Sequence, residues 1–426
     1  MSTRYERFQN EMAAGGSVVE NAPDEQPELW VQVVGIGAWI LLFGVLAFAS
    51  PWALVFVIGL LISIFLHECG HYWTARRTGM KVTQFFMGFG PRIFSFHRND
   101  VEYGLRAVPL GAFVRIIGMN NLDEVPAEDE AATYRQATYP RRMLVITAGS
   151  LMHMILAVAI ILGVYGLIGR PEESGRVTIQ EVVSTVQLED GTERPTPAGL
   201  AGLQPGDIVT AIDGQPMRTA TAFRRTLAAA GPGTTVTLDV VRDGVPLTVV
   251  ATLVQSPLIT DEVAGFLGVQ SSSIERIEQS WGDALTEGPT DLMRGVGQAV
   301  VGVAKVINPI NVWGHLTGTN EDESSRPGTV VGATRISDET GSFDGWAGVL
   351  SLLAAVNISV GVFNMFPLLP LDGGHAAIAT YERFREGKSR RRYFADVSKL
   401  MPVVSLTIAL LAFMFLTGLY LDTMQF

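Results

Sequence analysis

Long apolar segments alternate with polar segments along the 426-residue chain. A transmembrane helix needs about 20 predominantly apolar residues. Five segments meet this requirement and predict transmembrane helices, at 30–49, 52–75, 143–169, 346–366 and 401–421. Ser50-Pro51 divides the first two, because proline is unfavourable inside a helix and restricts the residue before it. The pattern predicts a multi-pass α-helical membrane protein.

The polar segments between the spans differ in character. Residues 1–29 are polar and acidic, and we interpret them as a cytoplasmic tail. Residues 280–312 show the one-sided apolar pattern of an interfacial amphipathic helix. Residues 314–345 are rich in Gly, Ser, Thr and acidic residues, and we interpret them as a mobile loop.

The segment 83–118 predicts a β-hairpin. Its two apolar stretches, 92–96 and 101–107, flank the polar turn Arg98-Asn99-Asp100. The hairpin is compatible with a cytoplasmic surface position. Its many glycines and apolar residues instead favour a sheet that enters the membrane, where an exposed strand edge can hold an unwound substrate by strand addition.

One short motif carries chemistry. His67, Glu68 and His71 form the pattern H-E-x-x-H at the end of the second apolar span. Histidines four residues apart on a helix share one face and can bind one zinc ion, while the glutamate can act as a general base toward a zinc-activated water. Three ionisable residues are costly in such a helix, which favours a functional role over passive structure. The sequence therefore predicts zinc-dependent hydrolysis within the membrane.

Composition and charge narrow the classes of function. The chain is 48% hydrophobic and 17% charged, its mean hydropathy is +0.28, and its formal net charge is −11. The acidic balance argues against nucleic acid as a partner. Ten Lys and Arg residues lie in 76–142 and seven in 381–400, which places both loops in the cytoplasm and 171–345 outside. Cys69 is the only cysteine, so an intramolecular disulfide is excluded.

A catalytic zinc site needs a third protein ligand. Asp372 is a lone carboxylate just beyond the fourth apolar segment, within the stretch Asn364 to His375. We include this stretch in the fourth transmembrane element, which then extends over 346–375. The surrounding prolines and glycines allow two interpretations: an ordinary helix-terminal turn, or a turn that brings Asp372 to the zinc site.

The pairing of H-E-x-x-H in an early span with N-x-x-P-x-x-x-L-D-G in a late span resembles the site-2 protease family of intramembrane zinc metalloproteases. The order of parts resembles the RseP type, and residues 66–82 are similar to its actinobacterial members. The resemblance implies that His67, His71 and Asp372 bind zinc, that Glu68 is the general base, and that Asn364 holds the substrate backbone near the metal.

The resemblance also implies partners and a location. These are single-span membrane substrates, with anti-sigma factors suggested, an upstream protease that trims them, and the bacterial plasma membrane. Residues 174–258 resemble a bacterial PDZ domain, an α+β fold predicted here outside the cytoplasm, which acts as a size filter or as a binder of carboxyl termini. His153 stands where the family carries an asparagine, and its role, like that of His375, stays open. The first span is an addition to the family pattern.

The sequence therefore predicts an intramembrane zinc metalloendopeptidase that cleaves the transmembrane segment of single-span, pre-trimmed substrates. A catalytically silent membrane scaffold that presents a PDZ domain is the main alternative, and a zinc transporter is a weaker one. A scaffold has no need of Glu68, and a transporter needs polar residues along several spans, of which the chain has few.

Overall fold

The computed structural model describes residues 28–119, 121–187, 193–255, 264–320, 322–387 and 392–424. The chain divides into two compact units: residues 1–164 together with 281–426, and residues 165–280. The tail predicted at 1–29 lies almost entirely outside the described residues.

Five helices of the first unit are long and apolar enough to cross a membrane, which confirms a multi-pass membrane protein. They are α2 (Leu29–Ala49), α3 (Pro51–Arg77), α4 (Tyr139–Leu167), α9 (Val330–Asn364) and α11 (Met401–Met424), which follows the short 3-10 turn η4 (Val397–Leu400). Ser50 separates α2 from α3. Its Oγ accepts a hydrogen bond from the Ala53 amide at 3.0 Å, and Pro51 occupies the first turn of α3, where a missing N–H costs nothing.

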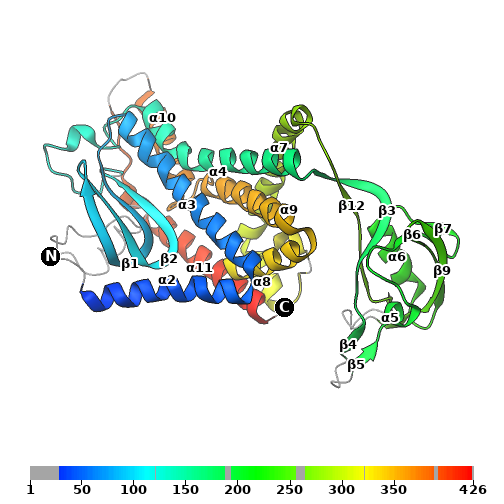
Figure 1. Ribbon diagram of the computed structural model, residues 1–426. Coiled ribbons are helices and arrows are strands. Elements are labelled where there is room, and N and C mark those ends of the chain that lie inside the picture. The colour runs from blue at the N-terminus through cyan, green and yellow to red at the C-terminus, as the bar shows by residue number, and fades with distance from the viewer. Residues whose placement is uncertain are drawn as a thin grey trace. The chain divides into compact units, whose positions relative to one another are not determined.

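Strands β1 (Val82–Arg98) and β2 (Val101–Ile116) form the hairpin of the first unit. Residues 84–87 of β1 pair with 112–115 of β2 on one side and with 102–105 on the other, so the hairpin folds back on itself. Residues 112–116 therefore form an edge of the sheet. Helix α2 contacts both strands of this hairpin and passes across one end of it in Figure 1.

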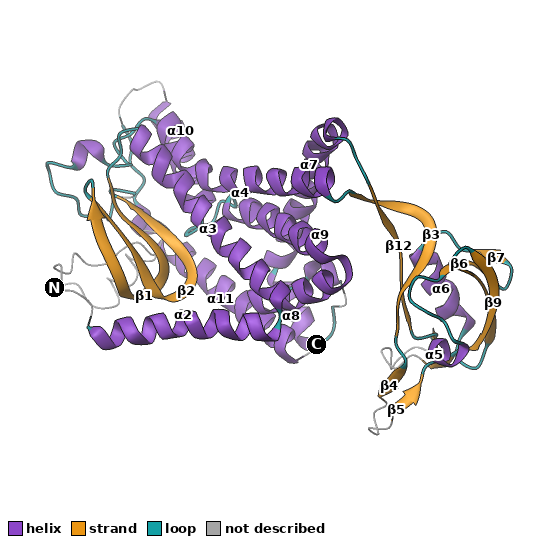
Figure 2. Ribbon diagram, in the orientation of Figure 1, coloured by secondary structure: helices purple, strands orange, loops and turns teal. Residues whose placement is uncertain are grey.

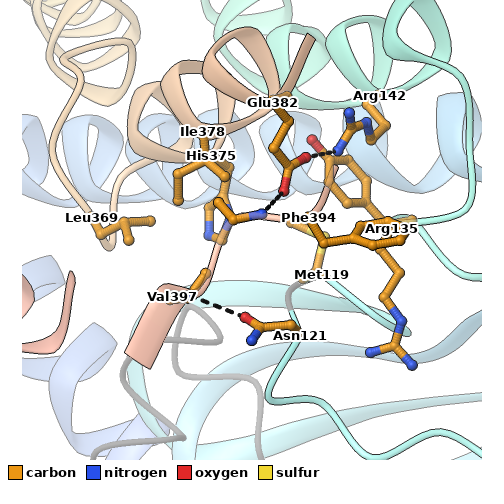
Figure 3. A pocket seen from close by; sticks show the side chains of 13 residues that line it. Met119, Asn121, Arg135, Arg142, Leu369, His375, Ile378, Glu382, Phe394 and Val397 are labelled. Atoms are coloured by element: carbon orange, nitrogen blue, oxygen red, sulfur yellow. Dashed lines mark hydrogen bonds and ion pairs between the residues drawn. The ribbon is translucent and has the colours of Figure 1, made fainter. Parts of the chain in front are cut away.

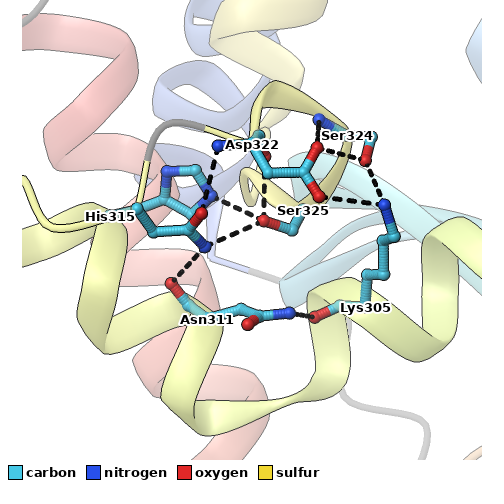
Figure 4. A network of polar contacts seen from close by, with 7 residues as sticks. Lys305, Asn311, His315, Asp322, Ser324 and Ser325 are labelled. Atoms are coloured by element: carbon cyan, nitrogen blue, oxygen red, sulfur yellow. Dashed lines mark hydrogen bonds and ion pairs between the residues drawn. The ribbon is translucent and has the colours of Figure 1, made fainter.

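The prediction of a mobile loop at 314–345 is wrong. Helix α7 (Trp281–Ile307) ends before Pro309, α8 (Pro309–Thr317) and the 3-10 turn η2 (Glu323–Ser325) follow, and α9 begins at Val330. Polar contacts order this region (Figure 4): Lys305 Nζ lies 2.9 Å from Asp322 Oδ2, and the His315 ring lies 2.9 Å from Ser325 Oγ. The polar composition of this segment predicted a loop, because its residues are ordered by hydrogen bonds and ion pairs with one another rather than by burial of apolar side chains.

Helix α9 also begins earlier than the predicted span. Asp422 of α11 is fully buried, and its Oδ2 accepts hydrogen bonds at 2.8 Å from the amide and the hydroxyl of Thr329, the residue that caps α9. A carboxylate at a helix N-terminus satisfies amides that have no partner within the helix. The helix is kinked at Gly345, close to the predicted start of the apolar span.

The element predicted at 346–375 is two helices rather than one. Helix α9 ends at Asn364, and α10 (Asp372–Glu386) begins at the predicted ligand Asp372. Pro367 and Pro370 lie between them and interrupt the helix. Asp372 thus lies in the first turn of a separate helix that folds back against the end of α9.

The second unit is a sheet with two helices, coloured by element type in Figure 2. The sheet order is β12-β3-β6-β8-β9, with every neighbouring pair antiparallel: β3 (Arg170–Val182), β6 (Ile208–Ile212), β8 (Thr235–Arg242), β9 (Val245–Thr252) and β12 (Val269–Ile277). Helices α5 (Pro197–Ala201) and α6 (Ala220–Ala230) complete the fold, and Phe223, Leu238 and Ile179 are fully buried in the core. The short strand β7 (Gln215–Pro216) also belongs to this sheet and pairs with β6. Two separate two-stranded sheets are formed by β4 (Thr185–Gln187) with β5 (Glu193–Pro195) and by β10 (Val254–Gln255) with β11 (Gly265–Phe266).

This unit extends beyond the range 174–258. Strand β3 begins at Arg170, β12 ends at Ile277, and the two strands pair with each other from Val182–Val269 to Arg170–Ile277. Both strands carry many polar residues, so an apolar pattern did not mark them.

Candidate metal centre

The centre begins with the last third of α3. His67 and His71 are four residues apart, are both buried, and point to the same place, with 3.1 Å between their Nε2 atoms. A hydrogen bond fixes the orientation of the His71 ring, because its Nδ1 lies 2.8 Å from the Val145 carbonyl oxygen of α4. An Nδ1–H donated to this carbonyl leaves the Nε2 lone pair free to bind a metal.

The turn after α9 carries Asp372 to these histidines. Its Oδ2 lies 3.4 Å from His67 Nε2 and 3.3 Å from His71 Nε2. Gly373 and Gly374 permit the close return of α10, since a Cβ at Gly373 would lie 2.2 Å from the Met365 carbonyl oxygen. Two segments about 300 residues apart therefore converge on one point.

The three ligand atoms fit a zinc ion. Ligand atoms held at zinc bond lengths of about 2.0–2.1 Å in a tetrahedral arrangement stand about 3.3–3.4 Å apart. The observed separations are 3.1, 3.3 and 3.4 Å. Asp372 Oδ2 is buried and has no hydrogen-bond partner among the described residues. A buried carboxylate oxygen that faces two imidazole nitrogens is stabilised by a cation at their centre.

Helix α4 shapes the other side of the centre, and sequence reasoning missed its contribution. A Cβ at Gly149 would lie 2.3 Å from His71 Nε2 and 2.5 Å from His67 Cε1. Only glycine therefore lets α4 approach the two histidines. The small residues Ala148, Gly149 and Ser150 in an apolar span are a signal of close helix packing that the sequence did offer.

Glu68 lies beside His67 and His71 in a pocket that Asp372 also lines. The pocket is lined by His67, Glu68, His71, Phe89, Ala112, Phe113, Val114, Ile116, Met119, Val145, Ile146, Pro370, Asp372 and His375. The edge residues 112–116 of the hairpin thus form one wall of the pocket that holds Glu68. The Glu68 carboxylate is not among the three groups that could hold a metal ion together.

His153 and His375 lie near the centre but outside the ligand cluster. The His153 ring lies 5.0 Å from the His67 ring, and its Nδ1 is 2.8 Å from Asn357 Oδ1. Asn357 Nδ2 donates in turn to Ser63 Oγ at 3.1 Å, so a buried polar network joins α3, α4 and α9. His153 is therefore a helix-joining residue in this structure.

A second cavity adjoins the metal pocket (Figure 3). Met119 and His375 line both cavities. Arg142 forms a buried ion pair with Glu382, which also accepts the Ala395 amide. Burial raises the pKa of Tyr134, and its hydroxyl has no hydrogen-bond partner among the described residues.

Asn364 is not part of the metal pocket. It is the last residue of α9, is half-buried, and does not contribute to the lining. Cys69 is buried in an apolar cluster with Phe85 and Val145, as expected of a packing residue.

Comparison with known proteins gives the family. The model of peptidase family M50 matches residues 55–411. The chain belongs to peptidase family M50. It is 34% identical over 358 residues to zinc metalloprotease Rip1 of Mycobacterium tuberculosis, a match that covers 78% of this chain and 85% of that protein. It is 33% identical over 402 residues to the Rip1 of Mycolicibacterium smegmatis, covering 85% and 95%.

A more distant relative supports the same assignment. The chain is 28% identical over 361 residues to a putative zinc metalloprotease of Agrobacterium fabrum, covering 79% of this chain and 88% of that protein. The predicted resemblance to the site-2 proteases, the predicted zinc metalloprotease activity and the predicted zinc cofactor are confirmed.

Proposed function

We propose that this M50 protease cleaves membrane-spanning substrates within the bilayer, with zinc held by His67, His71 and Asp372 and with Glu68 as the general base. The separations of 3.1 to 3.4 Å among the three ligand atoms carry the proposal. The location of the histidines in α3, one of the five apolar helices, supports an intramembrane reaction.

The reaction is hydrolysis of a peptide bond. When bound, zinc polarises the substrate carbonyl and lowers the pKa of a water molecule to about 7. Glu68 accepts a proton from this water as its oxygen attacks the carbonyl carbon, and delivers that proton to the amine nitrogen as the C–N bond breaks. His71, fixed by the Val145 carbonyl, keeps its Nε2 directed at the site throughout.

The hairpin edge provides a way to hold the substrate. A helical substrate must unwind before its peptide bond can reach the centre, because the helix hydrogen bonds occupy its carbonyls. An unwound segment placed against residues 112–116 would extend the sheet by one strand. Ala112, Phe113 and Val114 of this edge line the pocket beside Glu68, which supports this placement.

Asn364 is the proposed contact for a more distant part of the substrate backbone. Because it lies at the end of α9 and outside the pocket lining, the substrate has to extend from the metal toward the 364–372 turn to meet it. An Asn364→Ala variant should then raise KM. An unchanged KM and kcat would remove Asn364 from the substrate site.

The substrates we propose are single-span membrane proteins, with anti-sigma factors as the class, already trimmed by an upstream protease. We place the enzyme in the bacterial plasma membrane, with the unit of residues 165–280 as an extracytoplasmic PDZ domain. Labelling of a cysteine introduced at Thr219, in a Cys69→Ala background, tests the orientation. Labelling that requires permeabilised membranes would reverse it.

The experiment that tests the function is cleavage of a tagged single-span substrate in cells that lack the native enzyme. Glu68→Gln should abolish cleavage, because an amide cannot accept the proton from water. Glu181→Gln, an equivalent change at an exposed residue of β3, is the matched control and should cleave normally. Cleavage by correctly inserted Glu68→Gln at the wild-type rate would contradict the role of Glu68.

A further inference from the structure

Helix α2, the first helix of the described residues, lies outside residues 55–411 that match the family model, yet it makes specific contacts with the hairpin. Trp39 donates its indole N–H to the Arg106 carbonyl oxygen at 3.0 Å. Gly35 packs so closely that a Cβ there would lie 2.6 Å from the Ile93 side chain. Most of the remaining helix exposes large apolar side chains. The hairpin contact is therefore local and is centred on Arg106.

The Arg106 side chain extends this contact toward the turn of β1. It is 9% exposed, and its Nη1 donates to the Gly90 carbonyl oxygen at 2.9 Å. Its guanidinium also lies over two rings, 4.7 Å from the centroid of Phe86 and 5.1 Å from that of Phe113. A guanidinium over an aromatic face is attracted by the ring, more strongly where water is excluded.

These rings reach the metal pocket. Phe113 is stacked on Phe86, with centroids 5.6 Å apart, and on Phe89, with centroids 6.2 Å apart. Phe89 and Phe113 both line the pocket that contains Glu68. These contacts connect Trp39 through Arg106 to the aromatic wall of the site without a gap.

The turns that carry this wall need such support. Gly88, Gly90 and Gly111 all have positive φ, at 82°, 79° and 95°. Glycine loses more conformational freedom on folding than any other residue, so turns rich in glycine are costly to hold in one conformation. A Cβ at Gly111 would lie 2.6 Å from the Phe89 ring, so bulkier residues cannot replace this glycine without displacing the wall.

We propose that α2 is a positioning element of the active site, and that Trp39 and Arg106 are positioning residues that hold the Phe89–Phe113 wall against the substrate. The inference rests on the proposed function, in which substrate lies along residues 112–116. A fixed wall holds the substrate residue beside the scissile bond in one position before reaction. With a mobile wall, the free-energy cost of ordering that residue and the wall is added to the cost of binding substrate.

The test uses the full-length zinc enzyme with 4-fluorophenylalanine at position 89, observed by fluorine NMR in micelles. Trp39→Phe removes the indole donor, and Arg106→Met removes the cation at similar size. Both should broaden or split the single wild-type line. Ile40→Ala changes an exposed residue next to Trp39 and is the matched control, with the wild-type line expected. Arg106→Lys keeps a cation near both rings and should restore most of the line.

Kinetics on a single-span model peptide that the wild-type enzyme cleaves provide the second readout. Loss of one net hydrogen bond predicts an increase in KM of up to about tenfold for Trp39→Phe, with a smaller change in kcat. A variant that is only partly folded would instead lower kcat at unchanged KM. An unchanged fluorine line and KM in both Trp39→Phe and Arg106→Met would overturn the proposal. The fluorine line needs no turnover, so failure to cleave any peptide would contradict the proposed function and leave this test intact.

Discussion

Gly149→Ala is the substitution whose effect on the metal centre follows most directly from the structure. The added Cβ would lie 2.3 Å from His71 Nε2 and 2.5 Å from His67 Cε1, where ordinary contacts begin at 3.4 Å. Both neighbours are ring atoms of the proposed metal ligands rather than ends of flexible side chains. Helix α4 cannot retreat freely, because α9 also packs closely against it: a Cβ at Gly361 would lie 3.3 Å from the Ser150 carbonyl oxygen.

Two opposing effects determine the outcome. Replacing glycine by alanine inside a helix stabilises the helix by about 1 kcal/mol. Relief of the contact instead requires the imidazoles to move by about 1 Å, and a displacement of that size at a catalytic site can cost about 100-fold in activity. We therefore expect a folded, thermally stable protein with at least about tenfold weaker zinc binding and about 100-fold slower cleavage.

Gly163→Ala in the same helix is the matched control, because a Cβ there would meet no atom within 4 Å. It should retain wild-type zinc affinity and activity. Zinc affinity is measured by competition with a chelator, activity by peptide cleavage, and stability by thermal unfolding in detergent. A Gly149→Ala protein with wild-type zinc affinity and cleavage would refute the packing argument.

The remaining predictions concern the distant ligand, the second unit and its pH dependence. Asp372→Ala should lower zinc content together with activity, and full zinc occupancy in this variant would exclude Asp372 as a ligand. Replacing 170–277 by a flexible linker should permit cleavage of untrimmed substrate if this unit is a size filter, or reduce cleavage of trimmed substrate if it binds carboxyl termini. Untrimmed substrate that stays resistant while trimmed substrate is cut normally would contradict the filter. Burial alone would raise the pKa of Asp207, but hydrogen bonds from Arg242 lower it below its ordinary value. This stabilisation is present above pH about 4 and is lost as pH falls through the lowered pKa. The protection factors of the β6 amides, which are corrected for the intrinsic pH dependence of exchange, should therefore fall in acid, and this fall should be absent in Asp207→Asn.

The sequence predicted the elements that depend only on residues close together in the chain. Apolar length identified the five spans, and the i, i+4 spacing of His67 and His71 identified one face of a metal site. Proline at 51 marked the boundary between the first two helices. Asp372 needed more, because no local pattern connects it with α3, and the family resemblance provided that connection.

The errors have one physical cause, which is that polar contacts organise segments without an apolar pattern. Asp422 caps the start of α9, and the Lys305–Asp322 pair orders the connection that follows α7, so a segment predicted as a loop is largely helical. Strands β3 and β12 pair through their backbones with many polar side chains exposed. The role of Gly149 depends on how α4 packs against α3, and the local sequence of neither helix shows how the two pack together.

X-ray absorption at the zinc edge of the purified Glu68→Gln protein tests the central claim most directly. This variant should be inactive yet bind one zinc ion per chain, with two histidine nitrogens and one carboxylate oxygen at about 2.0–2.2 Å. Asp372→Ala should lose the oxygen from that set or lose the metal. A sulfur ligand from Cys69, an unchanged ligand set in Asp372→Ala, or no bound zinc in folded Glu68→Gln would contradict the account.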